Sequence, residues 1–332
     1  MAKYIVKRVL LSLLILFGVS IIIYAMVRMM PTDYVDNKMQ SQVAQGVVDE
    51  EDILRMKQLY GLDDNSFFGI IGGYFKWLGK ALSGDLGVSF KYGEPVGKVI
   101  GDYMWISFAI SIIATVLQYL FAIPLGIRCA TRQYGKLDYA ATVLAMVCIS
   151  LPSFFFAVLL LKIFSVDLGW FPLQGLVDPT KGYANGSFAQ FMDKVHHLII
   201  PITVLTVLGI GGLMRHTRTN TLEVLTADYI RTARAKGLSE GKVIYKHAFR
   251  NTMIPLVTMM AGMLPAAFGG AIITEQVFAI PGIGLKAYDA LKFGDIPFIM
   301  GYQMFLAVLT VIGTLLSDLM YAVVDPRVKL AR

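Results

Sequence analysis

Six long apolar stretches constrain this 332-residue chain more than any other feature of its sequence. A helix needs roughly 20 apolar residues to cross the hydrocarbon layer of a bilayer, which is about 30 Å thick. Charged residues make up only 16% of the chain, whereas a soluble domain has about 25%. We therefore predict an all-α integral membrane protein with six transmembrane helices. The predicted spans are Val9–Val27, Trp105–Ile127, Tyr139–Leu161, Leu198–Met214, Met253–Thr274 and Ile299–Val324.

The distribution of Lys and Arg sets the orientation of these helices. If the N-terminus is inside, the four cytoplasmic pieces hold 17 of the 30 Lys and Arg but only 5 of the 23 acids. Those pieces are 1–8, 128–138, 215–250 and 325–332. Both termini are therefore predicted to be cytoplasmic. The net charge of +7 follows from this topology and implies no nucleic-acid partner.

The spans divide the chain into four parts. They are a first transmembrane helix (1–30), an external segment (31–104), a core of five helices (105–324) and a cytoplasmic tail (325–332). The first helix is too long for the apolar region of a signal peptide and should remain uncleaved. Within the external segment we expect an amphipathic helix near Ile53–Tyr60 and an interfacial helix over Phe67–Leu82, which is rich in aromatic residues.

The sequence contains no enzyme motif in a context that would supply energy or chemistry. It has no G-x-x-x-x-G-K-[ST] loop for ATP and no H-E-x-x-H. The letters G-x-S-x-G occur once, at residues 237–241, but in a loop predicted to be helical and not on the strand-to-helix turn that a serine nucleophile elbow needs. The adjacent His196 and His197 have a poor geometry for chelating a metal. Cys129 and Cys148 are expected to stay unpaired and to pack passively. We expect no enzymatic activity, no cofactor and no metal site in this chain.

Polar side chains within the spans are candidates for a solute pathway. Four of them recur at helical spacing on one face of the second span and either line a wet cavity or bond to neighbouring helices: Ser107, Ser111, Thr115 and Gln118. Acids inside a bilayer are functional candidates. Glu275 lies at an external boundary, and Asp318 lies in the last span, close enough to its cytoplasmic end to pair at the interface.

Small residues recur in the fourth and fifth spans. Their spacing allows helices to approach closely, either within the chain or at a subunit interface or gate. In the fifth span they are Gly262, Ala266 and Gly270, and in the fourth, where we expect them to loosen its end, Gly209, Gly211 and Gly212.

The longest cytoplasmic loop, 215–250, carries eight Lys and Arg against three acids. Helix-forming residues end at Gly237, which can adopt the left-handed conformation that follows a helix. Ser239 then suits the N-cap of a second helix. The pattern predicts two short helices at an angle, with small Ala side chains near the bend that let another protein approach.

This loop resembles the EAA loop of the membrane subunits of ATP-binding-cassette importers, whose core is Glu-Ala-Ala, three residues and Gly. Here Arg replaces the Glu and Thr the first Ala. The departures are similar to the peptide/nickel subfamily, in which Arg-Thr-Ala-Arg-Ala-Lys-Gly-Leu is the usual form. The resemblance implies that a cytoplasmic ATPase contacts Arg231, Thr232, Ala233, Arg234, Ala235, Lys236, Gly237 and Leu238.

Further strings along nearly the whole chain resemble the same subfamily. They are Pro31–Asp33, Gly61–Asp63, Gly84–Ser89, Pro95–Val96, Glu275–Phe278 followed by Pro281–Gly284, and Tyr321–Arg327. Their order and spacing together are more specific than any one of them. The chain is thus similar to the first permease subunit of an oligopeptide or dipeptide importer, with the type I importer fold.

The resemblance implies a multi-pass protein of the cell membrane that works with several partners. A second, homologous permease would complete the pathway as a heterodimer. Two cytoplasmic ATPases would bind ATP and Mg²⁺, and an external binding protein would deliver the peptide. The pathway candidates in this chain are Ser107, Ser111, Thr115, Gln118, Glu275 and Asp318.

Three alternatives stay open on the sequence. In the first, the same machine imports nickel, glutathione or another small solute. In the second, the chain is a self-sufficient secondary transporter or channel, which should show charges near mid-membrane or paired broken helices. In the third, it is a membrane receptor or scaffold that binds through its external segment.

Overall fold

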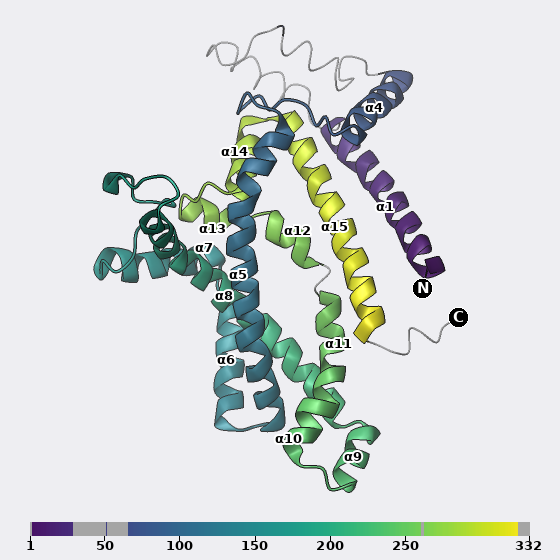
Figure 1. Ribbon diagram of the computed structural model, residues 1–332, viewed down its shortest axis with the longest axis vertical. Helices are drawn as coiled ribbons and strands as arrows, with labels where there is room; N and C mark the ends of the chain where they lie inside the picture. The colour runs from purple at the N-terminus through teal and green to yellow at the C-terminus, as the bar shows by residue number, and fades with distance from the viewer. Residues whose placement is uncertain (1, 29–50, 52–65, 260–261, 325–332) are drawn as a thin grey trace.

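A computed structural model describes residues 2–28, 51, 66–259 and 262–324, and within them the regular elements are all helices (Figure 1). Four helices are each long and apolar enough to cross a membrane. They are α1 (Ala2–Arg28), α5 (Val96–Thr131), α8 (Phe188–Leu225) and α15 (Ile296–Val324). With two bent helix pairs, the described part offers up to six crossings, which confirms the predicted all-α membrane class.

The first bent pair contains the third predicted span. α6 (Lys136–Ser150) turns by 104° into α7 (Ser153–Leu160) and the π-helix η1 (Leu161–Asp167). The bend lies at Leu151 and Pro152. Proline has no N–H to continue the helix, and it pushes the preceding residue into the extended conformation that Leu151 adopts. The prediction of one continuous helix over Tyr139–Leu161 was therefore wrong.

The second bent pair contains the fifth predicted span. Its first arm consists of α10 (Glu240–Lys242), the π-helix η3 (Val243–Ala248) and α11 (Phe249–Met259), and its second of α12 (Met263–Phe268) and α13 (Ile272–Val277). The arms are bent by 53°. Gly270, with φ of +78°, separates α12 from α13. A continuous helix over Met253–Thr274 is thus replaced by shorter pieces. The next helix along the chain is α14 (Ile283–Phe293).

Glycines allow α8 to pack closely against α5 and α6. A Cβ on Gly126 of α5 would lie 2.8 Å from the Met214 carbonyl oxygen, and one on Gly211 would lie 2.9 Å from the Ala145 carbonyl oxygen. α8 runs without a break through Gly209, so the expected loosening of this helix by its glycines was wrong. The two cysteines are free, as predicted.

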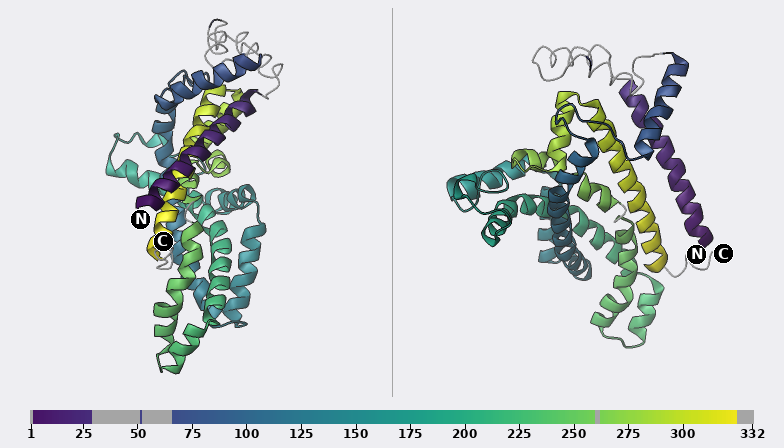
Figure 2. Two further views of the ribbon diagram at one scale, coloured as in Figure 1. Left: turned by 90° about the vertical axis from the view of Figure 1, so that its right-hand side faces the viewer. Right: turned by 45° about the horizontal axis from the view of Figure 1, so that its top comes forward.

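The helix that was predicted over Phe67–Leu82 is present at those bounds, as α4 (Phe67–Leu82). α4 lies against α1 (Figure 2), where the hydroxyls of Ser20 and Tyr74 are 2.8 Å apart and Tyr24 packs on Trp77. The same cluster includes Met300 of α15. The predicted amphipathic helix at residues 53–60 and the tail at 325–332 lie outside the described residues.

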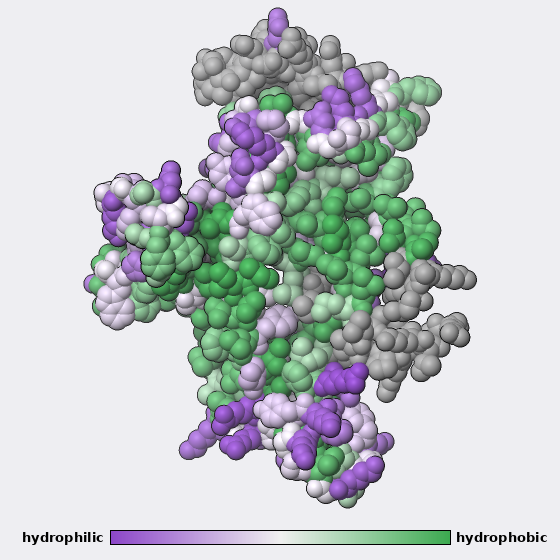
Figure 3. Space-filling view, viewed as in Figure 1, coloured by the Kyte–Doolittle hydropathy of each residue, from purple (hydrophilic) through white to green (hydrophobic). Residues whose placement is uncertain are grey.

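The surface separates into an apolar middle and polar ends (Figure 3). Arg8 Nη1 lies 3.0 Å from Asp318 Oδ2, so the start of α1 and the end of α15 are side by side. Both ends point toward the side that carries the helix α9 (Asp228–Ala235) (Figure 1). The predicted topology makes that side cytoplasmic.

Candidate functional site

Residues 226–250, in the loop predicted to be cytoplasmic, form a hairpin around the short helix α9, and we call them the cytoplasmic hairpin. The chain leaves α8 at Leu225, forms α9, and turns at Gly237, whose φ is +73° as its predicted left-handed role requires. Ser239 occupies the N-cap of α10, but its side chain makes no capping hydrogen bond. Only one of the two predicted short helices is separate, because α10 continues through η3 into α11.

The inner face of α9 packs on the second arm of the hairpin. Ile230 and Ala233 of α9 are buried together with Val243 and Ala248 of η3. Burying a side chain such as Ile230 contributes about 1.5–3 kcal/mol. Ala233 was expected to leave room for a partner protein, and the structure instead uses its small size inside the chain, where α9 meets η3.

The outer face of α9 is open to solvent. Arg234 forms an ion pair across the bend, with its Nε 2.8 Å from Glu240 Oε1. Leu238 is half-buried against the inner cluster. The remaining predicted contact residues are exposed: Arg231, Thr232, Ala235, Lys236 and Gly237. The hairpin therefore presents basic and small residues to solvent and packs on a buried apolar cluster.

A cavity of about 530 Å³ lies between the transmembrane helices. Its walls come from α5, α8, the end of α11 and the segment around α12. They are formed by Ser111, Ala114, Thr115, Gln118, Tyr119, Leu205, Gly209, Gly212, Leu213, His216, Met259, Gly262, Met263, Ala266, Ala267 and Ala271. Among these described lining residues there is no Asp, Glu, Lys or Arg. The cavity offers hydroxyl, amide and imidazole groups among small apolar side chains.

The structure brings three of the predicted pathway residues to this cavity. Ser111, Thr115 and Gln118 line it, and two of them also bond elsewhere. The Thr115 hydroxyl donates to the Ser111 carbonyl at 2.7 Å, and Gln118 Nε2 donates to the Leu205 carbonyl at 2.9 Å. This polar face therefore both lines a cavity and forms hydrogen bonds, including one to the neighbouring helix α8.

The other three predicted pathway residues lie elsewhere. Ser107 and Glu275 are buried together, with the Ser107 hydroxyl donating to Glu275 Oε1 at 2.7 Å. Asp318 pairs with Arg8 at the junction of α1 and α15. None of the three is among the lining residues of the cavity. Spacing along one helix gave the correct face for Ser111 but could not show which neighbour covers Ser107.

Small residues form much of the cavity wall. Gly212 and Gly262 have open space where a Cβ would stand, and Ala266 also lines the cavity. Of the two glycines in the fifth-span set, only Gly270 makes a close approach, since its Cβ would lie 2.5 Å from the Gly284 nitrogen. The four-residue spacing in the fifth span therefore serves the cavity more than a helix contact.

A buried ion pair near the cytoplasmic end was missed by sequence reasoning. Arg218 of α8 donates to Asp138 of α6 from Nε at 2.6 Å and from Nη2 at 2.8 Å. Asp138 also accepts from the Tyr134 amide at 2.9 Å, which holds Tyr134 at a φ of +63°. Residues 80 positions apart meet here, and only opposite charge at two helix ends hinted at the pairing.

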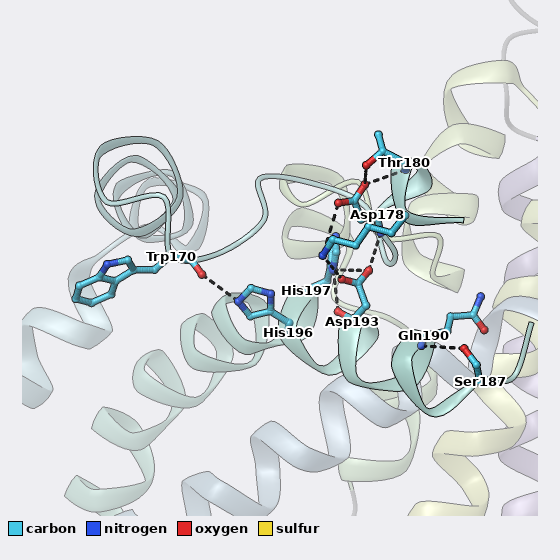
Figure 4. Close-up of polar contacts among 9 residues, drawn as sticks. Trp170, Asp178, Thr180, Ser187, Gln190, Asp193, His196 and His197 are labelled. Atoms are coloured by element: carbon cyan, nitrogen blue, oxygen red, sulfur yellow. Dashed lines mark hydrogen bonds and ion pairs between the residues drawn. The ribbon is translucent and has the colours of Figure 1, made fainter. Parts of the chain in front are cut away.

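A second cavity, of about 460 Å³, lies between the segment 169–181 and the start of α8, in the predicted second external loop. Figure 4 shows the polar contacts among the residues around it. Asp193 is buried next to two of the lining residues, and it accepts hydrogen bonds from the Asp178 amide at 2.7 Å and from Lys181 Nζ at 3.2 Å. This ion pair with Asp193 raises the pKa of Lys181. Hydrogen bonds from Thr180 hold the pKa of the Asp178 carboxyl below its ordinary value.

The two adjacent histidines point in different directions within this cluster. His196 Nε2 donates to the Trp170 carbonyl at 3.0 Å, and His197 Nδ1 donates to the Asp193 carbonyl at 2.8 Å (Figure 4). Among the described residues, no group of three His, Cys, Asp or Glu side chains is placed to hold a metal. The spacing of Asp193 and His197, four apart on a helix, was the available signal for this cluster.

Comparison with known proteins connects these features. The family described as "binding-protein-dependent transport system inner membrane component" matches residues 122–330. The oligopeptide transport system permease protein AppB of Bacillus subtilis is 38% identical over 330 residues, which cover 99% of this chain and 100% of that protein. A putative peptide permease protein of Brucella suis is 36% identical, with 99% of each chain covered. The dipeptide transport system permease protein DppB of Alkalihalophilus pseudofirmus is 32% identical, with 99% of this chain and 100% of that protein covered.

Proposed function

The chain belongs to the family of binding-protein-dependent transport system inner membrane components, and we propose that it admits oligopeptides or dipeptides through an ATP-driven importer. A permease of such a system works with a substrate-binding protein and with an ATPase. Relatives that match this chain over their full length carry peptide or dipeptide transport in their names. The observation that carries the proposal is the mechanical link between the cytoplasmic hairpin and the cavity.

The hairpin connects directly to two helices that line the cavity, so a movement of the hairpin can be transmitted to the cavity walls. α9 joins the end of α8 to the arm that leads into α11, and its buried face fixes it to that arm. α8 supplies Gly209, Gly212 and His216 to the cavity, and α11 supplies Met259. A force applied to the exposed face of α9 therefore moves two walls of the cavity together. Two ATPases that close on binding ATP would supply that force, with this helix docked in a groove on one of them.

ATP and Mg²⁺ bind in those partner ATPases under this proposal. The chain itself has no G-x-x-x-x-G-K-[ST] loop that would hold the phosphates. A second, homologous permease supplies the facing wall of the pathway, so that the cavity described above is one half of it. An external binding protein delivers the peptide.

The cavity chemistry suits a peptide of variable sequence. Hydroxyl and amide groups of Ser111, Thr115 and Gln118 can exchange hydrogen bonds with a peptide backbone. The described lining has no fixed charge that would select one side-chain charge. A nickel site would need several His, Cys or acidic ligands, and His216 is the only such residue in that lining.

A self-sufficient transporter is disfavoured by the same lining. The fifth span is broken beside the cavity, and secondary transporters also use broken helices. Their breaks bind a coupling ion or a charged substrate, and the described lining offers no carboxylate for a cation. Under this proposal, the energy for transport through the cavity comes from outside this chain.

The test is uptake of a labelled peptide into vesicles that hold this chain, the second permease and the ATPases, with binding protein outside and ATP inside. Gly237→Val should abolish ATP-dependent uptake, because a β-branched residue cannot adopt a φ of +73° without strain and the hairpin must change shape. Gly241→Val is the matched control, since Gly241 is exposed, nearby and has ordinary helical geometry. Uptake by this chain alone, without ATP, would overturn the proposal.

A further inference from the structure

Glu275 is a buried carboxylate that lies outside both the cavity and the cytoplasmic hairpin. It is on α13, and only 1% of the residue is exposed. Its Oε1 accepts hydrogen bonds from the Ser107 hydroxyl at 2.7 Å and from the Ala271 amide at 3.0 Å. Its Oε2 accepts one from the Leu285 amide at 2.8 Å. A carboxylate only accepts hydrogen bonds, so a shell of three donors suits it better than any amide.

The N-terminus of α14 is capped by residues of other elements. The first N–H groups of a helix have no partner inside it, and the N-cap of α14, Gly282, has no side chain to serve them. The Ile283 amide donates instead to Ser107 Oγ at 2.9 Å, and the Leu285 amide donates to Glu275. The partial positive charge of a helix N-terminus also favours a nearby carboxylate.

Three glycines enclose this carboxylate. A Cβ on Gly282 would lie 2.4 Å from Glu275 Cδ and 2.5 Å from Ser107 Oγ. One on Gly270 would lie 2.9 Å from Glu275 Oε1, and one on Gly284 would lie 3.0 Å from Oε2. The shell around Glu275 therefore has no room for another side chain, which explains why this turn is rich in glycine.

The cluster joins the cavity to the external end of the molecule. Ser107 lies on α5, one turn before the cavity-lining Ser111, and Ala271 lines the cavity itself. α14 stands beyond them, at the end opposite to α9 (Figure 1). One carboxylate thus holds both a wall of the cavity on α5 and a wall beside α12 to the first turn of α14.

We propose that Glu275 is a positioning residue for transport, which locks α14 to these two walls so that all three move as one unit. The link to transport rests on the proposed function. The lock itself rests on the hydrogen bonds and the glycine shell, and it can be measured without any transport assay.

The experiment uses the complex of this chain with the second permease and the ATPases. Glu275→Gln keeps the shape of the side chain but places an NH₂ group among donors. We expect amides 283–286 to exchange with deuterium roughly tenfold faster, because a buried donor without an acceptor makes local opening easier. Peptide uptake per ATP hydrolysed should fall about tenfold as well, as the walls and α14 lose their fixed relation. Gly101→Ala on α5, where a Cβ meets nothing within 4 Å, is the control.

A second variant separates a lock from general damage to the fold. Gly282→Ala should speed the same exchange in the wild-type background. It should add less than about twofold in the Glu275→Ala background, because removal of the carboxylate leaves space for the methyl group and ends the hydrogen bond that holds Ser107 Oγ against it, so that this hydroxyl can rotate away.

Four results are decisive. The proposal is overturned if Glu275→Gln leaves both the deuterium exchange of amides 283–286 and the peptide uptake per ATP hydrolysed at their wild-type values. It is also overturned if Gly282→Ala speeds this exchange by the same factor in the wild-type and the Glu275→Ala backgrounds. Faster exchange with unchanged uptake per ATP would overturn the link to transport. If the wild-type complex hydrolyses ATP but takes up no peptide, the proposed function fails, and the exchange data still decide whether the lock exists.

Discussion

The ion pair between Arg218 and Asp138 gives the sharpest stability prediction. The Asp138 side chain is 4% exposed and that of Arg218 is 22% exposed. Arg218→Ala leaves a buried carboxylate without its counter-ion, although the Tyr134 amide and the Thr142 side chain still donate to it. Breaking a buried pair from one side costs about 3–5 kcal/mol. Because Arg218 reaches solvent, water can partly replace it, and we expect a loss of about 3 kcal/mol, at the low end of that range.

The second substitution should partly rescue the first. Asp138→Asn in the Arg218→Ala background removes the uncompensated charge and leaves a neutral amide that still accepts from Tyr134. The double variant should therefore be more stable than Arg218→Ala alone, by about 1–2 kcal/mol. If the two side chains did not interact, the stability losses of the two single substitutions would simply add in the double variant.

The chain carries its own probe for this measurement. Cys129 is 0% exposed, and Cys148 is the only other cysteine. A dye that becomes fluorescent on reaction with thiols reports unfolding in detergent as Cys129 becomes accessible. The Arg218→Ala midpoint should fall by roughly 6 °C, at about 2 °C per kcal/mol for a large chain. Arg215→Ala, an exposed position on the same helix, is the control and should change it little.

A midpoint for Arg218→Ala equal to that of the control would refute the reasoning, because it would mean that the pair contributes nothing net. A double variant less stable than Arg218→Ala would refute it too, since the loss would then come from packing and not from the unpaired charge.

Three further predictions use the same melting assay. Gly126→Ala should destabilise the protein by about 1–3 kcal/mol, because its methyl group would press on the Met214 carbonyl oxygen, whereas Gly101→Ala on the same helix should be neutral or stabilising. Tyr134→Gly should raise the midpoint, since a left-handed φ costs a non-glycine residue about 1–2 kcal/mol, and an unchanged or lower midpoint would contradict this. Tyr74→Phe should cost about 1 kcal/mol through the lost hydrogen bond to Ser20, and an unaltered midpoint would show that α4 does not depend on it.

Features that depend on a short stretch of chain could be predicted. α4 begins and ends at the predicted residues because Ser66 caps its first turn and apolar residues continue to Leu82. Gly237 adopts the left-handed conformation because helix-forming residues end there and glycine accepts a positive φ at no steric cost. The bend at Pro152 could have been predicted in the same way, because proline interrupts a helix, but the prediction of a single span over Tyr139–Leu161 did not include it.

Features that depend on which helices face each other could not be predicted. Ser107 and Ser111 share one face of α5, yet one is buried against Glu275 and the other lines the cavity. The small side chain of Ala233 was predicted to give room to a partner protein, and in the structure it is buried inside the hairpin.

The sequence by itself determined that the chain crosses a membrane and that it turns at Gly237, and it predicts which loop faces the cytoplasm. Hydropathy, charge and allowed φ angles act over one helix or one turn, so their effects can be predicted from a short stretch of sequence. Only the tertiary structure decided the pairing of Glu275 with Ser107, 168 positions away, and of Arg218 with Asp138. Such contacts depend on burial by helices distant in sequence, and burial sets whether the same carboxylate is a solvated charge, a pathway group or a fixed point of the fold.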